Sequence, residues 1–296
     1  MEVSSCKGRE LEMLLTDLRV THPLRFSRGS FDEAVAGLEL LASIHAAFYE
    51  TPLPEGLWPE GSYWRLDTRL DELAQTDDPR VVRSARGIDL RLRGIIRRED
   101  GQEERRVARR TLVHGDPKGD NLLLSEPGSI YSSASSGSSS SGAGSPGVTP
   151  VITAAAYDFQ YCGGGLGVRD VAYFLCSAVD SRTLGAREDD LVTAYHAALL
   201  KGLRARGGGE GEDGGDGGVG GGSSSCSYPL EALRDDLELA VADYSRFMSG
   251  WGYWGNASWA EAKTLKCLDR IDGGKILPSE EDYVRAVARA YPFPEY

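Results

Sequence analysis

The clearest periodic pattern in the chain is an amphipathic stretch from residue 31 to about residue 49. It starts with Ser30 and, three positions later, Glu33, which is the polar pair of a capping box. One face of the stretch then carries Val35, Leu38, Ala42 and His45. This spacing predicts a helix that packs against a core, with His45 buried as a core histidine.

Short apolar runs predict strands on either side of a polar segment. Residues 111–113 and 122–124 are apolar, and the sequence HGDPKGDN lies between them at residues 114–121. A further apolar run, residues 151–159, carries Asp158 near its end. We therefore expect residues 114–121 to form a loop between two short strands, with Asp158 at the end of a third strand.

The remaining periodic segments predict mainly helices. Their apolar positions recur with a helical period, and the first of them carries arginines on its expected outer face. The expected helices cover about residues 77–100, 170–179, 189–203, 230–248 and 280–291. A small amount of sheet together with many helices indicates an α+β domain dominated by helices.

Two segments have low sequence complexity. Residues 127–148 are rich in serine, and residues 206–227 are rich in glycine. Such compositions bury almost no apolar surface and cannot offset the entropy of ordering, so we expect two flexible loops inserted into the domain. The segments that flank each insert are then expected to meet in space, because long surface loops close at modest cost.

Composition and charge restrict the function classes. Hydrophobic residues make up 41% of the 296 residues, which is enough for a sizeable core. The formal charge is 33 minus 45, or −12, and it disfavours a nucleic-acid partner, because phosphate backbones need a basic surface. There is no signal-peptide pattern and no run of 18 apolar residues, so we expect no membrane span. Five widely spaced cysteines without a CxxC pair indicate reduced thiols in a cytoplasmic protein, whose oligomeric state is left open.

The candidate chemistry lies in the polar segment and at the strand end that follows it. Asp116, Asn121 and Asp158 are oxygen-bearing side chains that we expect on adjacent loops. Phosphoryl transfer needs such a set, because one carboxylate accepts or orients the proton of the nucleophile and other oxygens bind Mg²⁺ at the phosphates. Each of these residue types is common in loops, so it is their joint order and spacing that points to this chemistry.

The spacing also matches a known superfamily. The pattern HxDxxxxN from His114 to Asn121, followed by Asp158, resembles the catalytic loop and metal-binding Asp of kinase-like enzymes. Gly115 stands where protein kinases usually have Arg, which is similar to aminoglycoside phosphotransferases and choline kinases. The stretch from Asp158 to Leu175 fits DFQYxGxGxGxxDVAYFL and resembles the ecdysteroid-kinase-like group of that superfamily.

The resemblance implies an enzyme that uses ATP and Mg²⁺ to transfer phosphate to a hydroxyl group of a small molecule. Asp116 is then the catalytic base, and Asn121 and Asp158 bind Mg²⁺. Lys118 is expected to contact the transferred phosphate, with a solvated surface lysine as the alternative.

Two further residues of the motif are expected to have structural roles in the catalytic site. By the resemblance, His114 forms hydrogen bonds within the loop rather than transferring protons. Asp170 stands at a predicted helix start, where it is expected to cap the helix and to hold the catalytic loop through backbone amides.

The segment at residues 11–18 resembles the hinge of the same family. It is apolar and then polar, which favours a strand that enters a connection, and a helix is the alternative. By the resemblance, the backbone of Thr16, Asp17 and Leu18 contacts the adenine of ATP. The domain is then expected to run from residue 11 to residue 296 as the helical C-terminal lobe of a protein-kinase-like fold, with the N-terminal lobe largely missing.

Other functions and several acceptors stay open at this point. A kinase-like module that binds a ligand or partner without turnover is the main alternative: the missing lobe favours it, and the retained site residues oppose it. A protein kinase is a weaker alternative because of Gly115. Choline, a sterol, an aminoglycoside and a sugar alcohol all remain candidate acceptors. An aromatic group is expected to be core packing, with an acceptor pocket as the alternative, and consists of Trp251, Tyr253, Trp254 and Trp259.

Overall fold

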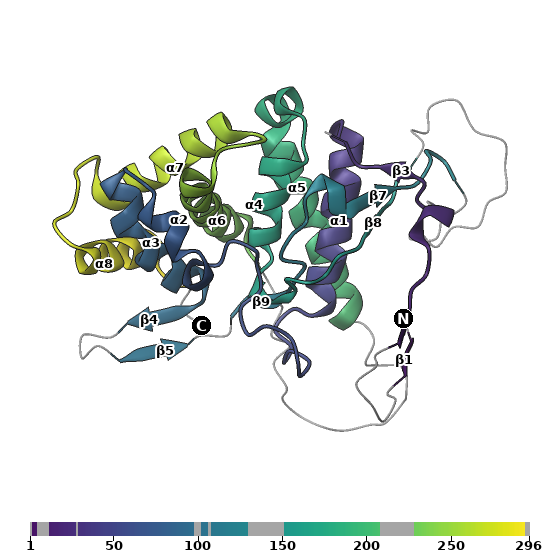
Figure 1. The fold of residues 1–296 in the computed structure, drawn as a ribbon, viewed down its shortest axis with the longest axis horizontal. Helices are drawn as coiled ribbons and strands as arrows, with labels where there is room; N and C mark the ends of the chain where they lie inside the picture. The colour runs from purple at the N-terminus through teal and green to yellow at the C-terminus, as the bar shows by residue number, and fades with distance from the viewer. Residues whose placement is uncertain are drawn as a thin grey trace, which may run out of the picture.

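The structure is a computed structural model, and it describes residues 2–4, 12–27, 29–97, 102–105, 108–129, 151–207 and 228–293. Helices make up most of the described chain (Figure 1). They are α1 (Phe31–Ala47), α2 (Leu70–Ala74), α3 (Pro79–Leu92), α4 (Val168–Ser177), α5 (Ser181–Gly207), α6 (Leu230–Trp251), α7 (Ala257–Asp272) and α8 (Glu280–Ala290). The strands are short, and they are β1 (Glu2–Ser4), β2 (Glu12–Leu14), β3 (Leu24–Arg25), β4 (Ile95–Arg97), β5 (Glu103–Arg105), β6 (Arg110–Val113), β7 (Leu122–Leu124), β8 (Ala154–Ala156) and β9 (Gly163–Leu166).

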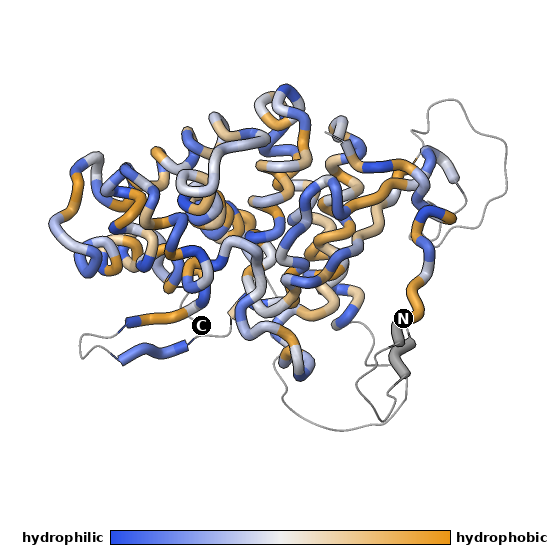
Figure 2. Tube along the Cα trace, viewed as in Figure 1, coloured by the Kyte–Doolittle hydropathy of each residue, from blue (hydrophilic) through white to orange (hydrophobic). Residues whose placement is uncertain are grey.

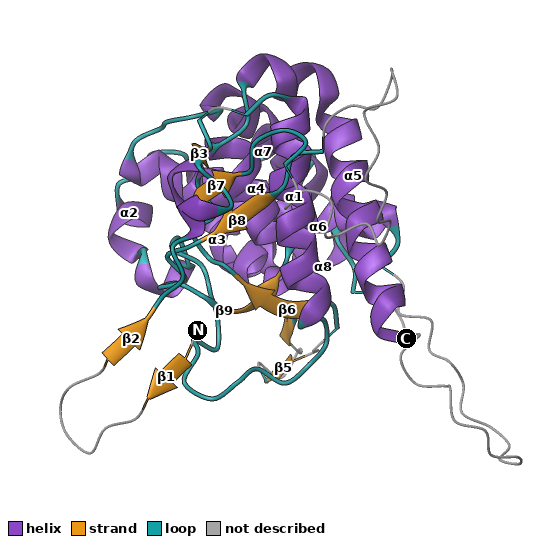
Figure 3. Ribbon diagram, turned by 90° about the vertical axis from the view of Figure 1, so that its right-hand side faces the viewer, coloured by secondary structure: helices purple, strands orange, loops and turns teal. Residues whose placement is uncertain are grey.

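The strands pair as small antiparallel sheets. β3, β7 and β8 form one sheet in the order β3-β7-β8, and β6 pairs with β9. β1 pairs with β2, and β4 pairs with β5. The ribbon of β1 and β2 projects from the body of the molecule (Figure 3). Many helices with small antiparallel sheets confirm the α+β class that the sequence predicts.

The helices pack around an apolar core, which appears as orange segments within the trace in Figure 2. α1 packs along α5, α3 along α8 and α6 along α7, while α4 contacts both α1 and α6. Leu38 of α1 and Phe174 of α4 are fully buried. Gly37 lets the two helices approach, because a Cβ at this position would lie 2.5 Å from the Phe174 ring. The helix α4 therefore joins the two groups of helices seen in Figure 1.

The helix predicted from residue 31 is confirmed as α1. Its capping box is present, with the Ser30 amide donating to Glu33 Oε2 at 2.7 Å, and Leu38, Ala42 and His45 are buried. The helices predicted near α4, α5, α6 and α8 are also present, whereas α7 was not predicted.

Several predicted elements have different boundaries. The strand expected over residues 151–159 covers only Ala154–Ala156, and α5 begins at Ser181 rather than near residue 189. α3 ends at Leu92 rather than near residue 100, because Gly94 adopts a φ of +71° and Ile95 begins β4. The strand expected over residues 11–18 covers only Glu12–Leu14. Asp17 instead caps a short 3-10 helix, Leu18–Val20, by accepting a hydrogen bond from the Arg19 amide at 3.0 Å. This local cap turns the chain where the sequence pattern predicted continued extension.

The flanks of the serine-rich insert meet, as predicted. β7 and β8 pair across it, and the Ser125 amide donates to the Thr153 carbonyl at 2.9 Å. One further step along, the Gly128 amide donates to the Val151 carbonyl at 3.1 Å. Most of the two predicted loops, residues 130–148 and 208–227, lies outside the described residues, and residues 206–207 belong to the end of α5.

None of the described helices combines the length and the apolar character needed to cross a membrane. The cysteines of the described residues, Cys162, Cys176 and Cys267, are free thiols. Burial raises the pKa of Cys267 to about 12, so this thiol stays protonated at neutral pH. Cys6 and Cys226 lie outside the described residues.

Three helices meet at one buried carboxylate. Asp272 of α7 accepts hydrogen bonds from the Arg80 guanidinium of α3 at 2.6 and 2.8 Å and from the Tyr283 hydroxyl of α8 at 2.7 Å. Burial acts to raise the pKa of Asp272, but these hydrogen bonds outweigh burial, and the pKa lies below its ordinary value. The folded chain therefore stabilises the ionised form of Asp272 more than the unfolded chain does.

Replacing Asp272 with Asn is expected to lower the free energy of unfolding by about 2–3 kcal/mol at neutral pH, because charged hydrogen bonds are lost. The pKa of Asp272 is depressed, so its contribution is complete above the unfolded pKa and is lost as the pH falls through the folded pKa. The difference between wild type and Asp272→Asn should thus shrink below about pH 4. Urea denaturation of the wild type and of Asp272→Asn at several pH values measures this difference in the free energy of unfolding.

Asp269→Asn is the matched control for this change. Asp269 contacts the same Arg80 at 2.7 Å, but its side chain is 61% exposed. Its replacement should cost less than about 1 kcal/mol. Equal losses for the two variants would contradict a special role of the buried carboxylate.

Candidate active site

The 114–121 loop, residues 114–121, connects β6 to β7. β6 is fixed by β9, with Val113 opposite Gly163, and β7 is fixed by β8, with Leu122 opposite Ala156. Both ends of the loop are therefore anchored by neighbours from the chain that follows the serine-rich insert. This topology places residues 157–162 beside the loop.

Asp170 holds the backbone at the start of the loop. Its carboxylate accepts hydrogen bonds from the His114 amide at 2.6 Å and from the Gly115 amide at 2.9 Å, and it is fully buried. The predicted hold on the loop is thus present, but the predicted helix cap is wrong. Gly167 is the N-cap of α4, and Asp170 lies inside the first turn. Its carboxylate is directed to the loop, where it satisfies two buried backbone amides, and buried amides need such partners.

Gly115 is required by the path of the loop. Its φ is +86°, in the left-handed region, and a Cβ at this position would lie 2.2 Å from the Tyr161 carbonyl oxygen. The Gly115 carbonyl also accepts the Tyr63 amide at 2.9 Å. Glycine is therefore needed at position 115 for two reasons: the backbone is left-handed there, and the Tyr161 carbonyl leaves no room for a side chain.

Asp116 lies at the centre of the loop, with unequal surroundings for its two carboxylate oxygens. Oδ2 accepts a hydrogen bond from Asn121 Nδ2 at 3.1 Å and lies 3.2 Å from Lys118 Nζ. Oδ1 is buried and has no hydrogen-bond partner among the described residues. Leaving a buried acceptor unpaired costs about 1–3 kcal/mol. The hydroxyl of the neighbouring Tyr173, a water molecule or a ligand can donate to this carboxylate.

Asn121 and Asp158 lie on neighbouring strand ends. The Tyr157 amide donates to the Asn121 carbonyl at 3.1 Å, which places Asp158 one residue beyond the β7–β8 pairing. Asp158 is exposed and has a φ of +64°. The amide nitrogen of Asn121 also donates to the Asp116 carbonyl at 2.8 Å. Because that nitrogen is engaged with Asp116, the side-chain oxygen of Asn121 is the group left for a ligand.

His114 joins the loop to the segment around Asp158. Its Nε2 lies 3.0 Å from the Tyr157 carbonyl, which can only accept, and its Nδ1 accepts the Asp116 amide at 3.3 Å. The ring also lies on Phe159, with 4.4 Å between the ring centroids. Both ring nitrogens are engaged, which agrees with the structural role expected for His114.

Oxygen donors of the loop fit Mg²⁺ better than a metal that needs a full protein cage. Among the described residues, no group of three or more His, Cys, Asp or Glu side chains is placed to hold a metal ion. One amide oxygen from Asn121 and one carboxylate from Asp158 suit Mg²⁺, which usually keeps several waters and binds through one or two protein ligands and phosphates. By type, an amide oxygen and a carboxylate are ligands that Mg²⁺ uses.

Comparisons with known proteins give no match for the chain among family models, curated proteins or solved structures.

Several aromatic side chains gather near Asp116, and most of them were not predicted from the sequence. We call this group the aromatic wall, and it consists of Tyr63, Tyr161, Tyr173, Trp251 and Trp254. Burial raises the pKa of Tyr173, and the charge of the Asp116 carboxylate and a side-chain hydrogen bond with it raise this pKa further. The Tyr63 ring packs on Tyr161 with centroids 5.0 Å apart, and it also packs on Trp251 with centroids 6.0 Å apart. Tyr161 and Tyr173 lie within the stretch from Asp158 to Leu175 that resembles the family, but Tyr63 belongs to no motif, and only the fold brings its ring to Tyr161.

The aromatic group predicted near the C-terminus divides in two. Trp251, Tyr253 and Trp254 are 52%, 43% and 39% exposed, and Trp254 packs on Tyr173 with centroids 6.0 Å apart. They are therefore not simple core packing. Trp259 is separate, because its Nε1 donates to Glu188 at 2.8 Å.

The expected adenine-binding segment has contacts of its own. Thr16 and Asp17 are exposed, and Leu18 is half-buried. The Asp17 carbonyl accepts the Val20 amide, and the Leu18 carbonyl accepts the amides of the two residues after Val20, so both serve the turn. His22, just after this turn, lies 3.2 Å from Thr153 at the start of β8, whereas Asp158 follows the end of β8. These contacts do not bring the segment to Asp158.

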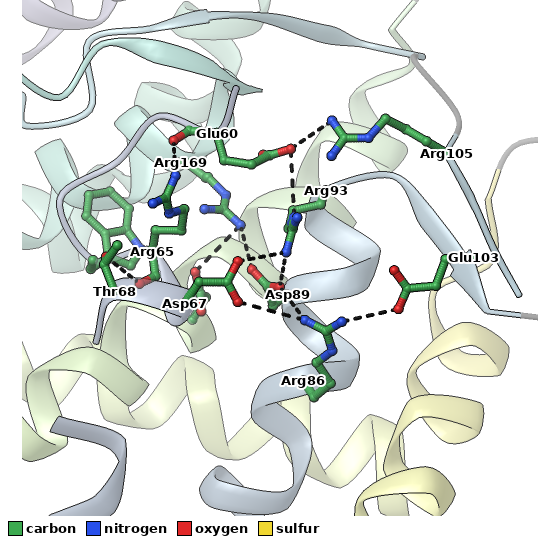
Figure 4. Close-up of polar contacts among 12 residues, drawn as sticks. Glu60, Arg65, Asp67, Thr68, Arg86, Asp89, Arg93, Glu103, Arg105 and Arg169 are labelled. Carbon is green, nitrogen blue, oxygen red and sulfur yellow. Dashed lines mark hydrogen bonds and ion pairs between the residues drawn. The ribbon is translucent and has the colours of Figure 1, made fainter. Parts of the chain in front are cut away.

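Buried charges surround the start of α4. Arg169, beside Asp170, is 1% exposed and lies 3.6 Å from Asp89 Oδ1 and 3.9 Å from Asp243 Oδ2. Burial raises the pKa of Asp89, while Arg169 and Arg93 act against this rise. Figure 4 shows the network continuing outward through Asp67, Arg86, Glu60, Glu103 and Arg105. Arginines expected on an outer helix face therefore pair with acids between helices, and α3, α4 and α6 are fixed together near the loop.

Replacing Gly115 with Ala is expected to lower the free energy of unfolding by about 3 kcal/mol or more, because strain at positive φ adds to a clash with the Tyr161 carbonyl. Gly56→Ala is the matched control, since Gly56 has a φ of +88° with nothing within 4 Å of an added Cβ. That variant should lose only about 1 kcal/mol. Chemical denaturation measures both, and equal losses would contradict the steric role.

Proposed function

We propose that this chain transfers the γ-phosphate of ATP to a hydroxyl group of a small molecule in a Mg²⁺-dependent reaction. The observation that carries the proposal is the Asp116 carboxylate. One oxygen is fixed by Asn121 and Lys118, and the other is buried and meets no hydrogen-bond donor of the described residues at hydrogen-bond length. Such an arrangement suits a group that receives a proton from a bound alcohol.

Asp116 Oδ1 accepts a hydrogen bond from the alcohol and takes its proton as the reaction proceeds. The alcohol oxygen forms a bond to the γ-phosphorus, and the bond from that phosphorus to the β–γ bridging oxygen breaks, so that ADP leaves with the bonding electrons. Asn121 orients Asp116 through Oδ2, which keeps Oδ1 directed at the alcohol. Catalysis of this kind rests on positioning and electrostatics.

The remaining site residues act on the phosphates. Bound Mg²⁺ neutralises charge on the phosphates of ATP, and Asn121 and Asp158 are the residues that hold it. Lys118 has a side chain that is 34% exposed beside Asp116, so it can turn from that carboxylate to the transferred phosphate. Backbone groups of Thr16 to Leu18 contact adenine in this proposal, which requires the segment to change its contacts from those described above.

The aromatic wall bounds the space next to Asp116 where the alcohol binds. Trp251 packs on Tyr63 and Trp254 packs on Tyr173, and both tryptophans are exposed. Aromatic faces contribute apolar contact and hydrogen-bond donors together. A small molecule with one reactive hydroxyl and an apolar or cationic body fits such a wall better than one that needs several carboxylates.

Replacing Asp116 with Asn is expected to reduce phosphate transfer about 10²–10⁴-fold, because the proton acceptor is lost. The assay is transfer of labelled phosphate from ATP to a panel of hydroxylated metabolites, with Mg²⁺-ATP binding measured in parallel. Asp120→Asn is the control, because Asp120 is an exposed carboxylate in the same loop and should leave activity unchanged. Binding of Mg²⁺-ATP without transfer to any hydroxyl would favour a non-catalytic binding module instead.

Replacing Asp158 with Asn is expected to raise the Mg²⁺ concentration needed for half-maximal ATP binding by about tenfold or more, because an anionic oxygen ligand is lost. Titration of Mg²⁺ at fixed ATP measures this shift. Asp116→Asn should leave the Mg²⁺ dependence of binding nearly unchanged, which separates the two roles. An unchanged requirement in Asp158→Asn would contradict metal binding at this residue.

A further inference from the structure

Asp170 is itself held by a second layer of buried side chains. His45 Nε2 lies 3.1 Å from Asp170 Oδ2, and His45 Nδ1 lies 2.8 Å from the Tyr195 hydroxyl. The exposed fraction is 1% for His45 and Tyr195 and 0% for Asp170. Water does not compete for hydrogen bonds at this depth, so each one has a large influence on orientation.

The donors and acceptors give this chain of hydrogen bonds one direction. The Asp170 carboxylate already accepts the amides of His114 and Gly115, and it can only accept, so His45 donates through Nε2–H. His45 Nδ1 is then the acceptor for the Tyr195 hydroxyl. Burial, followed by the charge of Asp170, raises the pKa of Tyr195 well above its ordinary value, so the hydroxyl retains the proton that it donates.

The three side chains come from three different helices. Tyr195 lies in α5, His45 in α1 and Asp170 in α4, and the hydrogen bonds end on the 114–121 loop. Thr111 of β6 adds a bond from its hydroxyl to the His45 carbonyl at 2.7 Å. The strand that leads into the loop and the carboxylate that holds the loop are thus tied to the same histidine.

Gly167 shows how closely the pair is enclosed. A Cβ at this N-cap would lie 2.6 Å from His45 Nδ1 and 2.7 Å from the Tyr195 hydroxyl oxygen. The φ of Gly167 is −55°, which any residue adopts, so the absence of a side chain here serves space rather than backbone freedom. The position leaves room for the hydrogen bond between His45 and Tyr195.

We propose that His45 and Tyr195 are positioning residues for the 114–121 loop. They hold the Asp170 carboxylate in the orientation that binds the amides of His114 and Gly115, and through these amides they set the place of Asp116. The positioning serves the phosphate transfer proposed above, but the hydrogen bonds themselves can be tested without any activity.

The first test is hydrogen exchange at the amides of His114 and Gly115 in Tyr195→Phe, a variant that removes one hydroxyl and keeps the ring. Exchange at these two amides should speed up about fivefold, the effect of one typical hydrogen bond. Tyr283→Phe is the matched control, because it removes a buried tyrosine hydroxyl that serves Asp272 far along the chain. The proposal is overturned if exchange at both amides is unchanged, or if it rises equally throughout the core.

Gly167→Ala tests the same proposal without removing any hydrogen-bonding group. The added methyl displaces His45 from Tyr195, so exchange at His114 and Gly115 should again rise severalfold. Gly185→Ala is its control, since Gly185 lies in α5 with nothing within 4 Å of an added Cβ. If the amides of His114 and Gly115 exchange at the same rate in Gly167→Ala and Gly185→Ala, the positioning role of His45 and Tyr195 is contradicted.

The protonation of His45 gives a readout that a purely structural role would not move. The sequence contains only four histidines, so ¹⁵N resonances of labelled imidazole rings can be assigned by replacing each in turn. His45 should carry its proton on Nε2, and Tyr195→Phe should shift the Nδ1 resonance toward that of an unbonded acceptor. A proton on His45 Nδ1 would contradict the proposed order of donors and acceptors, in which Tyr195 donates to His45 and His45 donates to Asp170.

Kinetics then separates this proposal from the proposed function. If a phosphate acceptor is found, Tyr195→Phe should lower kcat severalfold with KM for ATP nearly unchanged, because the loop rather than nucleotide binding is affected. A change in KM alone would contradict the positioning role. If no acceptor is found, the exchange and resonance measurements still decide the role of His45 and Tyr195, so failure of one proposal does not hide failure of the other.

Discussion

The Asp170 carboxylate is the group on which the candidate site depends. It lies without exposed surface among helices, and two backbone amides of the 114–121 loop donate to it. A buried charge is costly unless donors surround it, and here the loop backbone supplies those donors. The same contact therefore stabilises the carboxylate and gives the loop a single conformation, in which Gly115 takes a left-handed φ and Asp116 follows in a fixed place.

Other buried charges near α4 are paired less closely than Asp170. Arg169 reaches its acids at 3.6 and 3.9 Å, which is beyond hydrogen-bond length. Such buried pairs contribute little net stability, but losing one partner is strongly destabilising, because the other charge is then buried without a partner. Their effect is to restrict how α3, α4 and α6 can sit against one another. A loop that is held by α4 needs α4 itself to have one position.

The sequence predicts the parts of this site that depend on neighbouring residues and on simple strand patterns. Asn121 and Asp158 were expected on adjacent loops, and the pairing of β7 with β8 places them there. The hold of Asp170 on the loop was expected from the family resemblance, but its cap role was wrong, because Gly167 is the N-cap of α4. The place of Tyr63 near Tyr173 and Asp116 was not predicted, because segments far apart in the sequence meet there only when the chain folds.

The hydrogen bonds that join Ser125 to Thr153 and Gly128 to Val151 have a consequence for protein engineering. Hydrogen bonds from β7 to β8 and at Gly128 complete the junction, whatever chain connects the two sides. Each doubling of a connecting segment adds only about 0.6 kcal/mol of closure entropy. A fluorescent reporter or an affinity tag could therefore replace the serine-rich connection while the strands stay paired. The chain thus contains a permissive insertion point at the start of β8, with Asp158 beyond the other end of this strand.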